Sequence, residues 1–429
     1  MDNVTPINRN TRRPEWLKRM IISKKDQQPA SCLANALAVL QYHPDWVDVL
    51  AYDEFRDEVV KTGAPPFEEA SPLGPWTDDD SVAAAAWLHR SAAHLNVSVS
   101  IVDQCVALAA KQHSFHPVRA YLQGLKWDGE QRLPTWLATY LGVPPTDYAE
   151  QIGKRWLISA VARVMRPGCK VDCMLVLEGK TGKGKSTALR ILGGDEWFSD
   201  TPFEIGNKDA YQALRNVWLY EIAELDAIRG REHSRVKAFV SSPVDSYRPS
   251  FGRRVRQFPR QCVFAGTTNE RQYLGDRTGN RRFWPVATHE IDLDALRRDR
   301  DQLWAEAFAR YESGEVWHVD TKELSDLAAA EQASRELPDD WIEIVSDWLE
   351  NPTVPAHNDN GRVPIHVDEG VTTAQILLGA LRKKPGEISH SDSIRAGHVL
   401  RAISWEPRLI RLKDQNVTGR ERRYFKCSK

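Results

Sequence analysis

Residues 172–194 read DCMLVLEGKTGKGKSTALRILGG, and this stretch decides the fold. It begins with a compact apolar run that stops at a glycine, which is typical of a buried strand in a parallel sheet. It ends with apolar residues at helical spacing, followed by a pair of glycines. The stretch therefore predicts a strand, a loop rich in glycine and lysine, and a helix in direct succession.

The loop matches the pattern GxxxxGK[ST] in full. Its glycines allow successive backbone N–H groups to point at phosphate oxygens, and the following helix presents its positive N-terminus. Lys185 is placed to reach the outer phosphates of a nucleotide, and the Ser186 hydroxyl is placed to hold Mg²⁺. We therefore predict a site for ATP and Mg²⁺ whose cofactor-binding residues are Gly179, Lys180, Thr181, Gly182, Lys183, Gly184, Lys185, Ser186 and Thr187.

Two acids belong to the next strand-like run, VWLYEIAEL at 217–225. On a strand, Glu221 shares a face with Val217 and Leu219, and burial there is unfavourable for a charge unless it meets a metal. Glu224 follows the run, where an active-site acid is expected. We favour Glu224 as the residue that polarises the attacking water and Glu221 as its helper, and the reverse order stays open. Both are candidate metal ligands beside the Ser186 hydroxyl.

A further strand-like run ends at Asn269, and we expect it to lie between the strand of the two acids and the strand before the glycine loop. Asn269 would then position the hydrolytic water, although asparagine is also common in ordinary turns. The pair Arg281 and Arg282 precedes Phe-Trp-Pro. Either it stacks on Trp284, or one guanidinium reaches the γ-phosphate held by a neighbouring subunit. The second reading implies an oligomer with sites at its interfaces.

Positive charge is concentrated in one part of a nearly neutral chain. The formal net charge is −1, yet nine Lys or Arg residues face only two acids between Arg229 and Arg260. Within this part, DSYRPSFGRRVRQFPRQCVF at 245–264 predicts a hairpin whose tip lies near residues 250–252. Arginines contact phosphates and aromatic rings stack on bases, so the hairpin is a candidate DNA contact, whereas a solvated arginine-rich surface is the alternative. The residues concerned are Arg248, Arg253 and Arg254.

The remaining sequence indicates several domains, as a chain of 429 residues suggests. The pattern is helical from Leu33 to about Ala110, interrupted by a proline-rich loop. Two short helices flank a Trp-Asp-Gly turn before a longer amphipathic helix, and strands then alternate with helices, as in a parallel α/β sheet. Three helices and two short strands close the chain. We expect a flexible basic arm, a mainly helical N-terminal domain, a P-loop ATPase core and a winged-helix-like DNA-binding domain at residues 1–30, 31–147, 148–325 and 335–429.

The composition excludes some classes of protein. Apolar runs fall short of a membrane span, and no apolar core follows the N-terminal charges, as a secretory signal requires. Of the six cysteines only Cys169 and Cys173 lie close together, without a second pair to complete a zinc site. A soluble cytoplasmic protein with free thiols is expected.

Four segments, in this order, resemble the virulence-associated protein E family: GKTGKGKST, WLYEIAELDAIR, KAFVSSPVDSYRPSFGR and GTTNERQYLGDRTGNRRFWPV. The resemblance covers Pro117–Val286 closely. That family is encoded by phages, prophages and phage-like islands and is related to superfamily 3 helicases within the AAA+ ATPases. The resemblance implies a replication ATPase of a mobile element in a bacterial host. It further implies a ring-forming protein that grips single-stranded DNA in its pore. We expect six subunits in this ring, with duplex DNA bound by the winged-helix-like C-terminal domain.

The resemblance also implies roles for single residues. It assigns Lys185 and Ser186 to Walker A, and Glu221 and Glu224 to Walker B. The further assignments are Asn269 as sensor 1, Arg281 or Arg282 as the arginine finger, and Lys237, Arg253 and Arg254 as pore contacts to DNA. Superfamily 3 enzymes often carry adjacent acids in Walker B, whereas here they lie three residues apart, so the metal-ligand assignment stays open. Primase activity is not expected, because the preceding residues contain no evident catalytic acid triad.

Three functions remain in consideration. The favoured one is an ATP-dependent DNA helicase or translocase that acts in replication of a phage or mobile element. The second is an ATP-switched origin-binding protein that recruits a helicase without unwinding DNA itself. The third is a phosphotransferase or signalling ATPase with no DNA role, because P-loops serve many functions.

Overall fold

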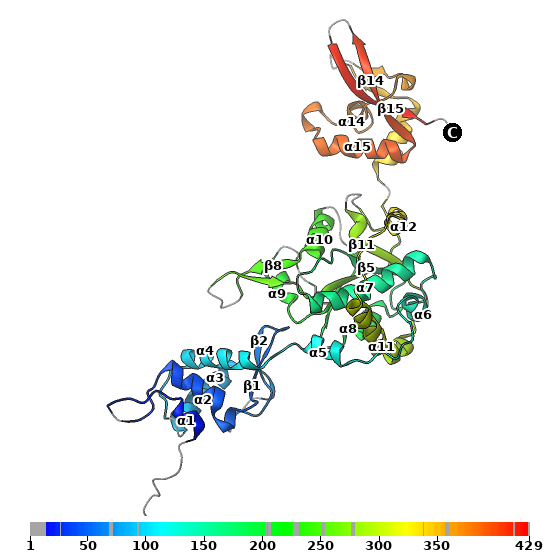
Figure 1. Ribbon diagram of the computed structural model, residues 1–429. Helices are drawn as coiled ribbons and strands as arrows, with labels where there is room; N and C mark the ends of the chain where they lie inside the picture. The colour runs from blue at the N-terminus through cyan, green and yellow to red at the C-terminus, as the bar shows by residue number, and fades with distance from the viewer. Residues whose placement is uncertain are drawn as a thin grey trace, which may run out of the picture. The chain divides into compact units, whose positions relative to one another are not determined.

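The computed structural model describes residues 14–25, 27–67, 72–91, 94–202, 204, 207–225, 231–249, 254–275, 279–337, 339–356, 361–414 and 417–427. The chain divides into two compact units, the first ending at Glu336 and the second beginning at Leu337 (Figure 1). Across the ranges given, each helix is too short or too polar to cross a membrane.

A five-stranded parallel sheet forms the centre of the first unit. Every neighbouring pair of its strands runs parallel, which confirms the parallel α/β sheet predicted from the sequence. Parallel strands are buried on both faces and read as continuous apolar runs, as the strand before the glycine loop does. The strands lie in the order β11 (Phe283–Ala287), β5 (Met174–Glu178), β10 (Val263–Thr268), β7 (Leu219–Ile222) and β6 (Phe198–Ser199).

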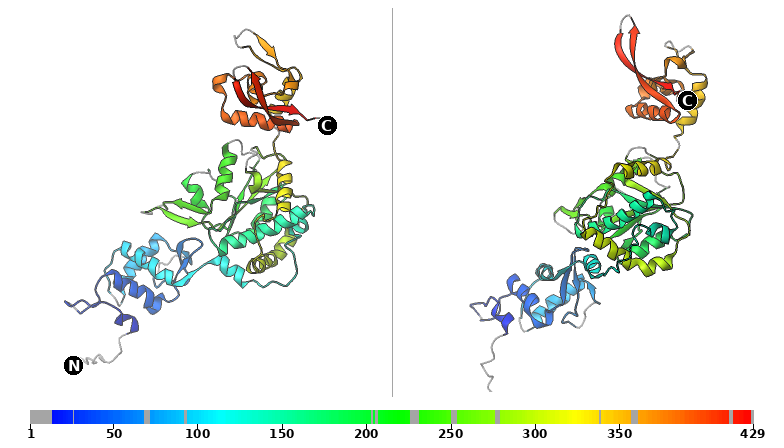
Figure 2. Two further views of the ribbon diagram at one scale, coloured as in Figure 1. Left: turned by 45° about the horizontal axis from the view of Figure 1, so that its top comes forward. Right: turned by 45° about the vertical axis from the view of Figure 1, so that its right-hand side comes forward.

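Helices cover both faces of this sheet, so the architecture has three layers (Figure 2). Alternate side chains of β5 enter different cores, because successive residues of a strand point to opposite faces. Leu175 and Leu177 pack with one set of helices, α7 (Asp147–Met165), α8 (Lys185–Gly193) and α11 (Leu293–Glu312). Met174 and Val176 pack with the other set, α9 (Lys208–Ala213) and α10 (Arg231–Ser241).

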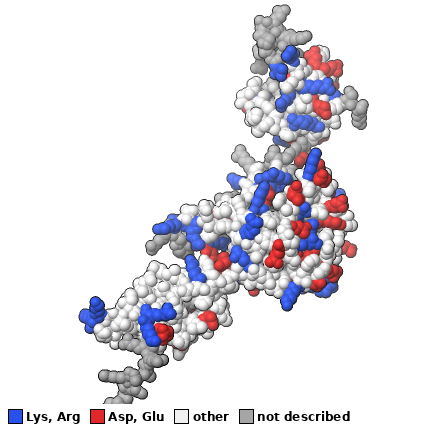
Figure 3. Space-filling view, in the orientation of Figure 1, with Lys and Arg blue, Asp and Glu red and all other residues white. Residues whose placement is uncertain are grey.

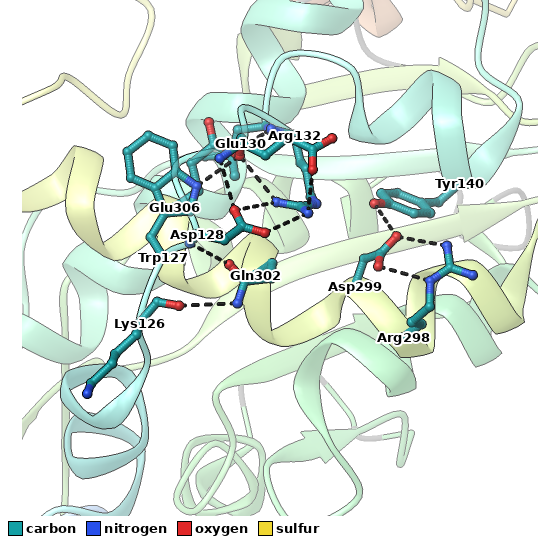
Figure 4. Close-up of polar contacts among 11 residues, drawn as sticks. Lys126, Trp127, Asp128, Glu130, Arg132, Tyr140, Arg298, Asp299, Gln302 and Glu306 are labelled. Atoms are coloured by element: carbon teal, nitrogen blue, oxygen red, sulfur yellow. Dashed lines mark hydrogen bonds and ion pairs between the residues drawn. The ribbon is translucent and has the colours of Figure 1, made fainter.

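The Trp-Asp-Gly turn lies between two short helices, as predicted, and is fastened to α11 (Figure 4). The backbone N–H of Asp128 donates to Gln302 at 3.0 Å. The fully buried carboxylate of Glu306 accepts from the backbone N–H groups of Arg132 and Leu133 at 2.5 and 2.9 Å. These contacts hold the turn against the helix that supports the glycine loop. The two short helices are α5 (Pro117–Gly124) and α6 (Trp136–Leu141).

The N-terminal part of the first unit differs from the prediction in two respects. It contains the expected helices and also a small sheet, which the sequence did not indicate. In addition, Trp16 and Met20 are buried in its core, so residues 14–25 are not an arm. The helices are α1 (Glu15–Lys18), α2 (Leu33–Tyr42), α3 (Asp78–Arg90) and α4 (Val99–Ala110), and the strands are β1 (Leu50–Asp53), β2 (Glu58–Lys61), β3 (Gly74–Pro75) and β4 (Ser114–Phe115).

The predicted arginine-rich hairpin is present and protrudes from the part that carries the sheet (Figure 1). Its arms are β8 (Val244–Tyr247) and β9 (Arg256–Pro259), which pair antiparallel with Tyr247 opposite Arg256. The buried ion pair between Asp245 and Arg260 fixes the base of the hairpin, with nitrogen–oxygen distances of 2.5 and 3.0 Å. Its tip, residues 250–253, lies outside the described residues.

The second unit follows the predicted order of three helices and two strands. The two strands are ten residues long each, hence longer than predicted, and pair along their whole length. A hairpin between the first and second helices was not predicted. The elements are α13 (Trp341–Glu350), β12 (Thr353–Pro355), β13 (Arg362–Pro364), α14 (Thr373–Gly379), α15 (His390–Ala402), β14 (Trp405–Asp414) and β15 (Val417–Lys426).

Candidate functional site

The glycine loop joins the end of β5 to the start of α8. Gly184 has φ +90°, which non-glycine residues rarely adopt, and it directly precedes the first turn of α8. At Gly179 a Cβ atom would lie 2.7 Å from Thr288 Oγ1. The backbone therefore follows this tight path because glycine occupies both positions.

A cavity of about 510 Å³ opens beside this loop. Lys185 lies at its floor, only 7% exposed, and its Nζ donates to the carbonyl oxygens of Gly179 and Lys180 at 2.5 and 3.0 Å. The same ammonium donates to Asn269 Oδ1 at 3.2 Å. The loop and the residue that follows β10 thus share one cation. The cavity is lined by the loop residues 181–187 together with Ala223, Glu224, Thr267, Thr268, Asn269 and Leu293.

Glu221 lies under the cavity and is 1% exposed. Its Oε1 accepts hydrogen bonds from Ser186 Oγ at 2.7 Å and from Thr267 Oγ1 at 2.6 Å. Its Oε2 is buried and has no hydrogen-bond partner within the described part of the chain. A buried carboxylate normally has all its oxygens satisfied, so the second oxygen indicates a place for a further donor or a cation.

Glu224 differs from Glu221 in exposure and backbone. It is exposed, lines the cavity and has φ +53°, which is uncommon for a residue with a Cβ atom. Such backbone conformations persist where the surrounding structure enforces them, and they concentrate at functional sites. Asn269 is also exposed and follows β10, which lies between β5 and β7 as the sequence predicted.

A buried network that sequence reasoning missed anchors the start of the loop. Glu178 is 2% exposed and forms a bidentate pair with Arg335, at 2.9 and 3.0 Å. It also accepts from the Tyr273 hydroxyl at 3.1 Å, while its backbone carbonyl accepts from Thr288 Oγ1 at 2.7 Å. Burial alone would lower the pKa of Arg335, but the pairing with Glu178 raises it overall. No local motif marks Arg335, because it lies 157 residues away in the chain.

The two arginines before β11 lie at the opposite edge of the sheet. Phe283 pairs with Met174 and Ala287 with Glu178, so the start of β11 is separated from the glycine loop by the length of β5, about 13 Å. Arg281 is 73% exposed and lies 3.7 Å from Asp172. Arg282 is half-buried and bonded to Ser241 Oγ. Neither arginine is brought to the cavity of its own chain.

The DNA-contact candidates fall into three groups. Arg248 and Arg254 are exposed beside the hairpin tip, where Figure 3 shows basic side chains on the protruding side of the unit. Arg253 lies outside the described residues. Lys237 corrects the prediction: it is 5% exposed, with its Nζ 5.9 Å from the Phe283 ring centroid. The face of α10 that packs on the sheet buries this lysine, so it offers no surface contact to DNA.

Comparison with known proteins gives a family and a distant structural likeness. The family model for the virulence-associated protein E-like domain matches residues 122–336, half of the chain. No curated protein matches. Two apo structures of the NrS-1 C-terminal region, one of them in an A form, each have 10% sequence identity and a TM-score of 0.45. Their matches cover 88% of this chain and 95% and 96% of theirs, and similarity at this level supports no conclusion about function.

Proposed function

Because the chain belongs to the virulence-associated protein E-like family, we propose that it is an ATP-hydrolysing DNA translocase that acts in replication of a phage or mobile genetic element. The observation that carries the ATPase part is the meeting of Ser186 and Glu221 at 2.7 Å between the glycine loop and a buried strand. A hydroxyl and a carboxylate in this position, beside a loop of inward-turned backbone and a buried lysine, suit a nucleotide with its metal ion.

The loop residues would bind the phosphates. Glycines at positive φ free the backbone N–H groups to turn toward phosphate oxygens, and the nine-residue helix α8 adds the positive end of its dipole. The Lys185 ammonium already lies among three acceptor oxygens, so a short movement would bring it to a terminal phosphate. Thr187 follows at the first turn of α8 and lines the same cavity. The nucleotide is proposed to be ATP.

The residues present also fit Mg²⁺. The Ser186 hydroxyl and the unpartnered Glu221 Oε2 are hard oxygen donors, which this cation prefers, and Glu224 can contribute from the cavity wall. Bound there, the ion would neutralise charge that develops on the phosphates.

Glu224 and Asn269 are the groups best placed to act on water. Both are exposed and line the cavity, whereas Glu221 is buried and occupied by two hydroxyl donors. A carboxylate at Glu224 can accept the proton of an attacking water, and the Asn269 amide can orient it. This supports Glu224 as the polarising acid and Glu221 as the residue that holds the metal side.

The position of the arginines supports action between subunits. An arginine finger must reach a γ-phosphate, and Arg281 and Arg282 lie one strand length from the cavity of their own chain. Arg281 is the more exposed of the two, since Arg282 is bonded to Ser241. We therefore propose an AAA+ ring, of six subunits, in which Arg281 completes the site of the neighbouring chain.

Two basic surfaces support the DNA role. The protruding hairpin carries exposed Arg248 and Arg254, and in a ring such hairpins would contact a single strand. In the second unit, Arg411 lies directly opposite Arg420 on the long ribbon of β14 and β15, and both are exposed. Three helices and a protruding basic ribbon suit a winged-helix-like contact with duplex DNA, dominated by phosphates.

The test is steady-state ATP hydrolysis with and without single-stranded DNA, in the wild type, Lys185→Ala and Arg254→Ala. We expect DNA to stimulate turnover, Lys185→Ala to abolish it, and Arg254→Ala to lose only part of the stimulation. Turnover that ignores DNA would contradict the translocase and favour a signalling ATPase. Stimulated turnover without strand displacement on a forked duplex would instead favour a protein that recruits a helicase.

A further inference from the structure

The carboxylate of Asp57, in the turn between β1 and β2, contacts the base of the arginine-rich hairpin. Asp57 has φ +55° and its side chain is 18% exposed. It accepts two hydrogen bonds from Arg256, at 3.0 and 3.1 Å, and further ones from Arg215 and the Tyr52 hydroxyl. A single carboxylate therefore holds two arginines that come from different segments of the chain.

Both guanidinium groups pack against the ring of Phe258. Arg215 Cζ lies 4.1 Å and Arg256 Cζ 5.0 Å from the ring centroid of Phe258. Phe258 packs against Tyr247 with centroids 4.7 Å apart, and Tyr211 stacks on Tyr247 with centroids 6.4 Å apart. A cavity of about 220 Å³ is lined by both arginines, Phe258 and Tyr211. The rings fix the planes of the guanidinium groups, as a site for a planar or tetrahedral anion requires.

The donors of this cluster outnumber the acceptors that Asp57 supplies. Arg215 Nε and the Tyr247 hydroxyl are buried and have no hydrogen-bond partner among the residues that the structure describes. A carboxylate offers two oxygens, whereas a phosphate group offers more acceptor positions in a tetrahedral arrangement. The cluster thus has more donors than its present anion can satisfy.

We propose that Arg215, Arg256 and Tyr247 form a binding site for a backbone phosphate of single-stranded DNA, and that Asp57 occupies it until a strand displaces the carboxylate. The inference rests on the proposed DNA role and adds a site at the base of the hairpin to the arginines near its tip. It also assigns a task to the N-terminal part of the first unit, which restrains the hairpin through one turn.

The carboxylate is a persistent competitor near neutral pH. Burial alone would raise the pKa of Asp57, but hydrogen bonds from Tyr52 and Arg256 and the charge of Arg215 lower it overall. Arg256 remains accessible despite this contact, since 55% of its side chain is exposed. A strand can therefore meet Arg256 first and displace Asp57 afterwards.

The same turn offers a matched control. Glu54 carries the same charge, but its carboxylate pairs with Arg119 at 3.3 Å. Replacing Glu54 by glutamine changes the net charge of the chain by the same amount as replacing Asp57 by asparagine. A difference between the two variants therefore reports the contact with the arginines rather than long-range charge.

The test is the affinity of the full chain for a fluorescein-labelled oligothymidylate, followed by fluorescence anisotropy. We expect Asp57→Asn to bind about fivefold more tightly than the wild type, and Glu54→Gln to stay within about twofold. Arg256→Ala should weaken binding, and in the double variant with Asp57→Asn the gain should disappear. ATP hydrolysis without DNA, measured on each variant, reports that the fold is intact.

Two results would overturn the inference while leaving the proposed function in place. One is equal affinity of Asp57→Asn and Glu54→Gln, with the wild type still binding DNA. The other is a gain that survives in the double variant with Arg256→Ala. Lack of binding by every variant, Asp57→Asn included, would overturn both the site and the DNA part of the proposed function.

Discussion

The two edges of the central sheet carry different chemistry. At the edge where the strands end, polar side chains lie close together and are bonded to one another, as Lys185 is to Asn269 and Ser186 is to Glu221. At the edge where the strands begin, Arg281 and Arg282 have their partners at the surface and on α10. Arg281 contacts Asp172 across 3.7 Å, and most of its side chain is exposed.

The difference shows which edge can form a complete site within one chain. Carboxyl ends of parallel strands converge on one crevice, so residues distant in sequence meet there, and helix α8 adds its N-terminus. The edge where the strands begin presents Arg281, a long cation that is mostly exposed. Arg281 is therefore suited to contact a group outside its own chain. Four measurements test this difference between the two ends of the strands.

The largest effect is expected at Lys185. Lys185→Ala should lower the rate of ATP hydrolysis by about 1,000-fold, because the variant loses the buried ammonium that the proposed function places at the terminal phosphate. The measurement is phosphate release at saturating ATP. The control is Lys170→Ala, at the edge where the strands begin. The side chain of Lys170 is 78% exposed, and its removal should leave the rate unchanged. Equal losses in both variants would contradict the division between the edges.

A second prediction compares the stability of the two edges. Arg335→Ala leaves the carboxylate of Glu178 buried without its cation and should lower the free energy of unfolding by about 3 kcal/mol. Arg281→Ala removes an exposed pair and should cost less than about 0.5 kcal/mol. Urea unfolding followed by tryptophan fluorescence measures both. Similar losses would show that the starting edge is as tightly coupled as the other.

A third prediction concerns action between chains. Arg281→Ala should reduce ATP hydrolysis by about 100-fold if this guanidinium completes a neighbour's site. Mixing Arg281→Ala with Lys185→Ala should restore part of the activity, because one kind of interface then combines an intact loop with an intact arginine. Arg282→Ala is the comparison variant, since its side chain is bonded to Ser241. An absence of recovery in the mixture would contradict the proposed finger.

The smallest effect distinguishes the roles of Glu221 and Glu224, the two acids at the edge where the strands end. Glu221→Gln should weaken binding of a fluorescent ATP analogue in the presence of Mg²⁺ by about tenfold, because Glu221 lies against Ser186. Glu224→Gln should change this affinity by less than about twofold while lowering turnover. The readouts are the dissociation constant and the rate of phosphate release. The opposite pattern would reverse the roles assigned to these residues.

The sequence predicted the ending edge well because its signals are local. The glycine loop is a contiguous motif, and Glu221 and Asn269 each mark the end of an apolar run. Parallel topology then requires these ends to meet, and Asn269 does lie between the other two strands. The placement of these side chains was therefore predictable, whereas their chemical roles remain predictions.

The rest of the fold depended on information that no local pattern holds. Glu178 and Arg335 pair across 157 residues, and Asp57 and Arg256 across 199. The strands β1 and β2 have four residues each. So short a stretch shows too little alternation of apolar and polar residues to be recognised among the neighbouring helices. Lys237 was assigned to the pore through the family resemblance, and no local pattern shows that its side chain is buried beside Phe283.

The ion pair of Arg335 with Glu178 also affects how force along the backbone would reach the glycine loop. The second unit begins at Leu337, two residues after Arg335. The guanidinium of Arg335 binds Glu178, the residue directly before Gly179. Tension along the backbone from the second unit would meet the contacts of Glu336 with Leu274 and Asn280 first, and then the pair of Arg335 with Glu178. One ion pair thus joins the start of the glycine loop to the segment that leads into the second unit.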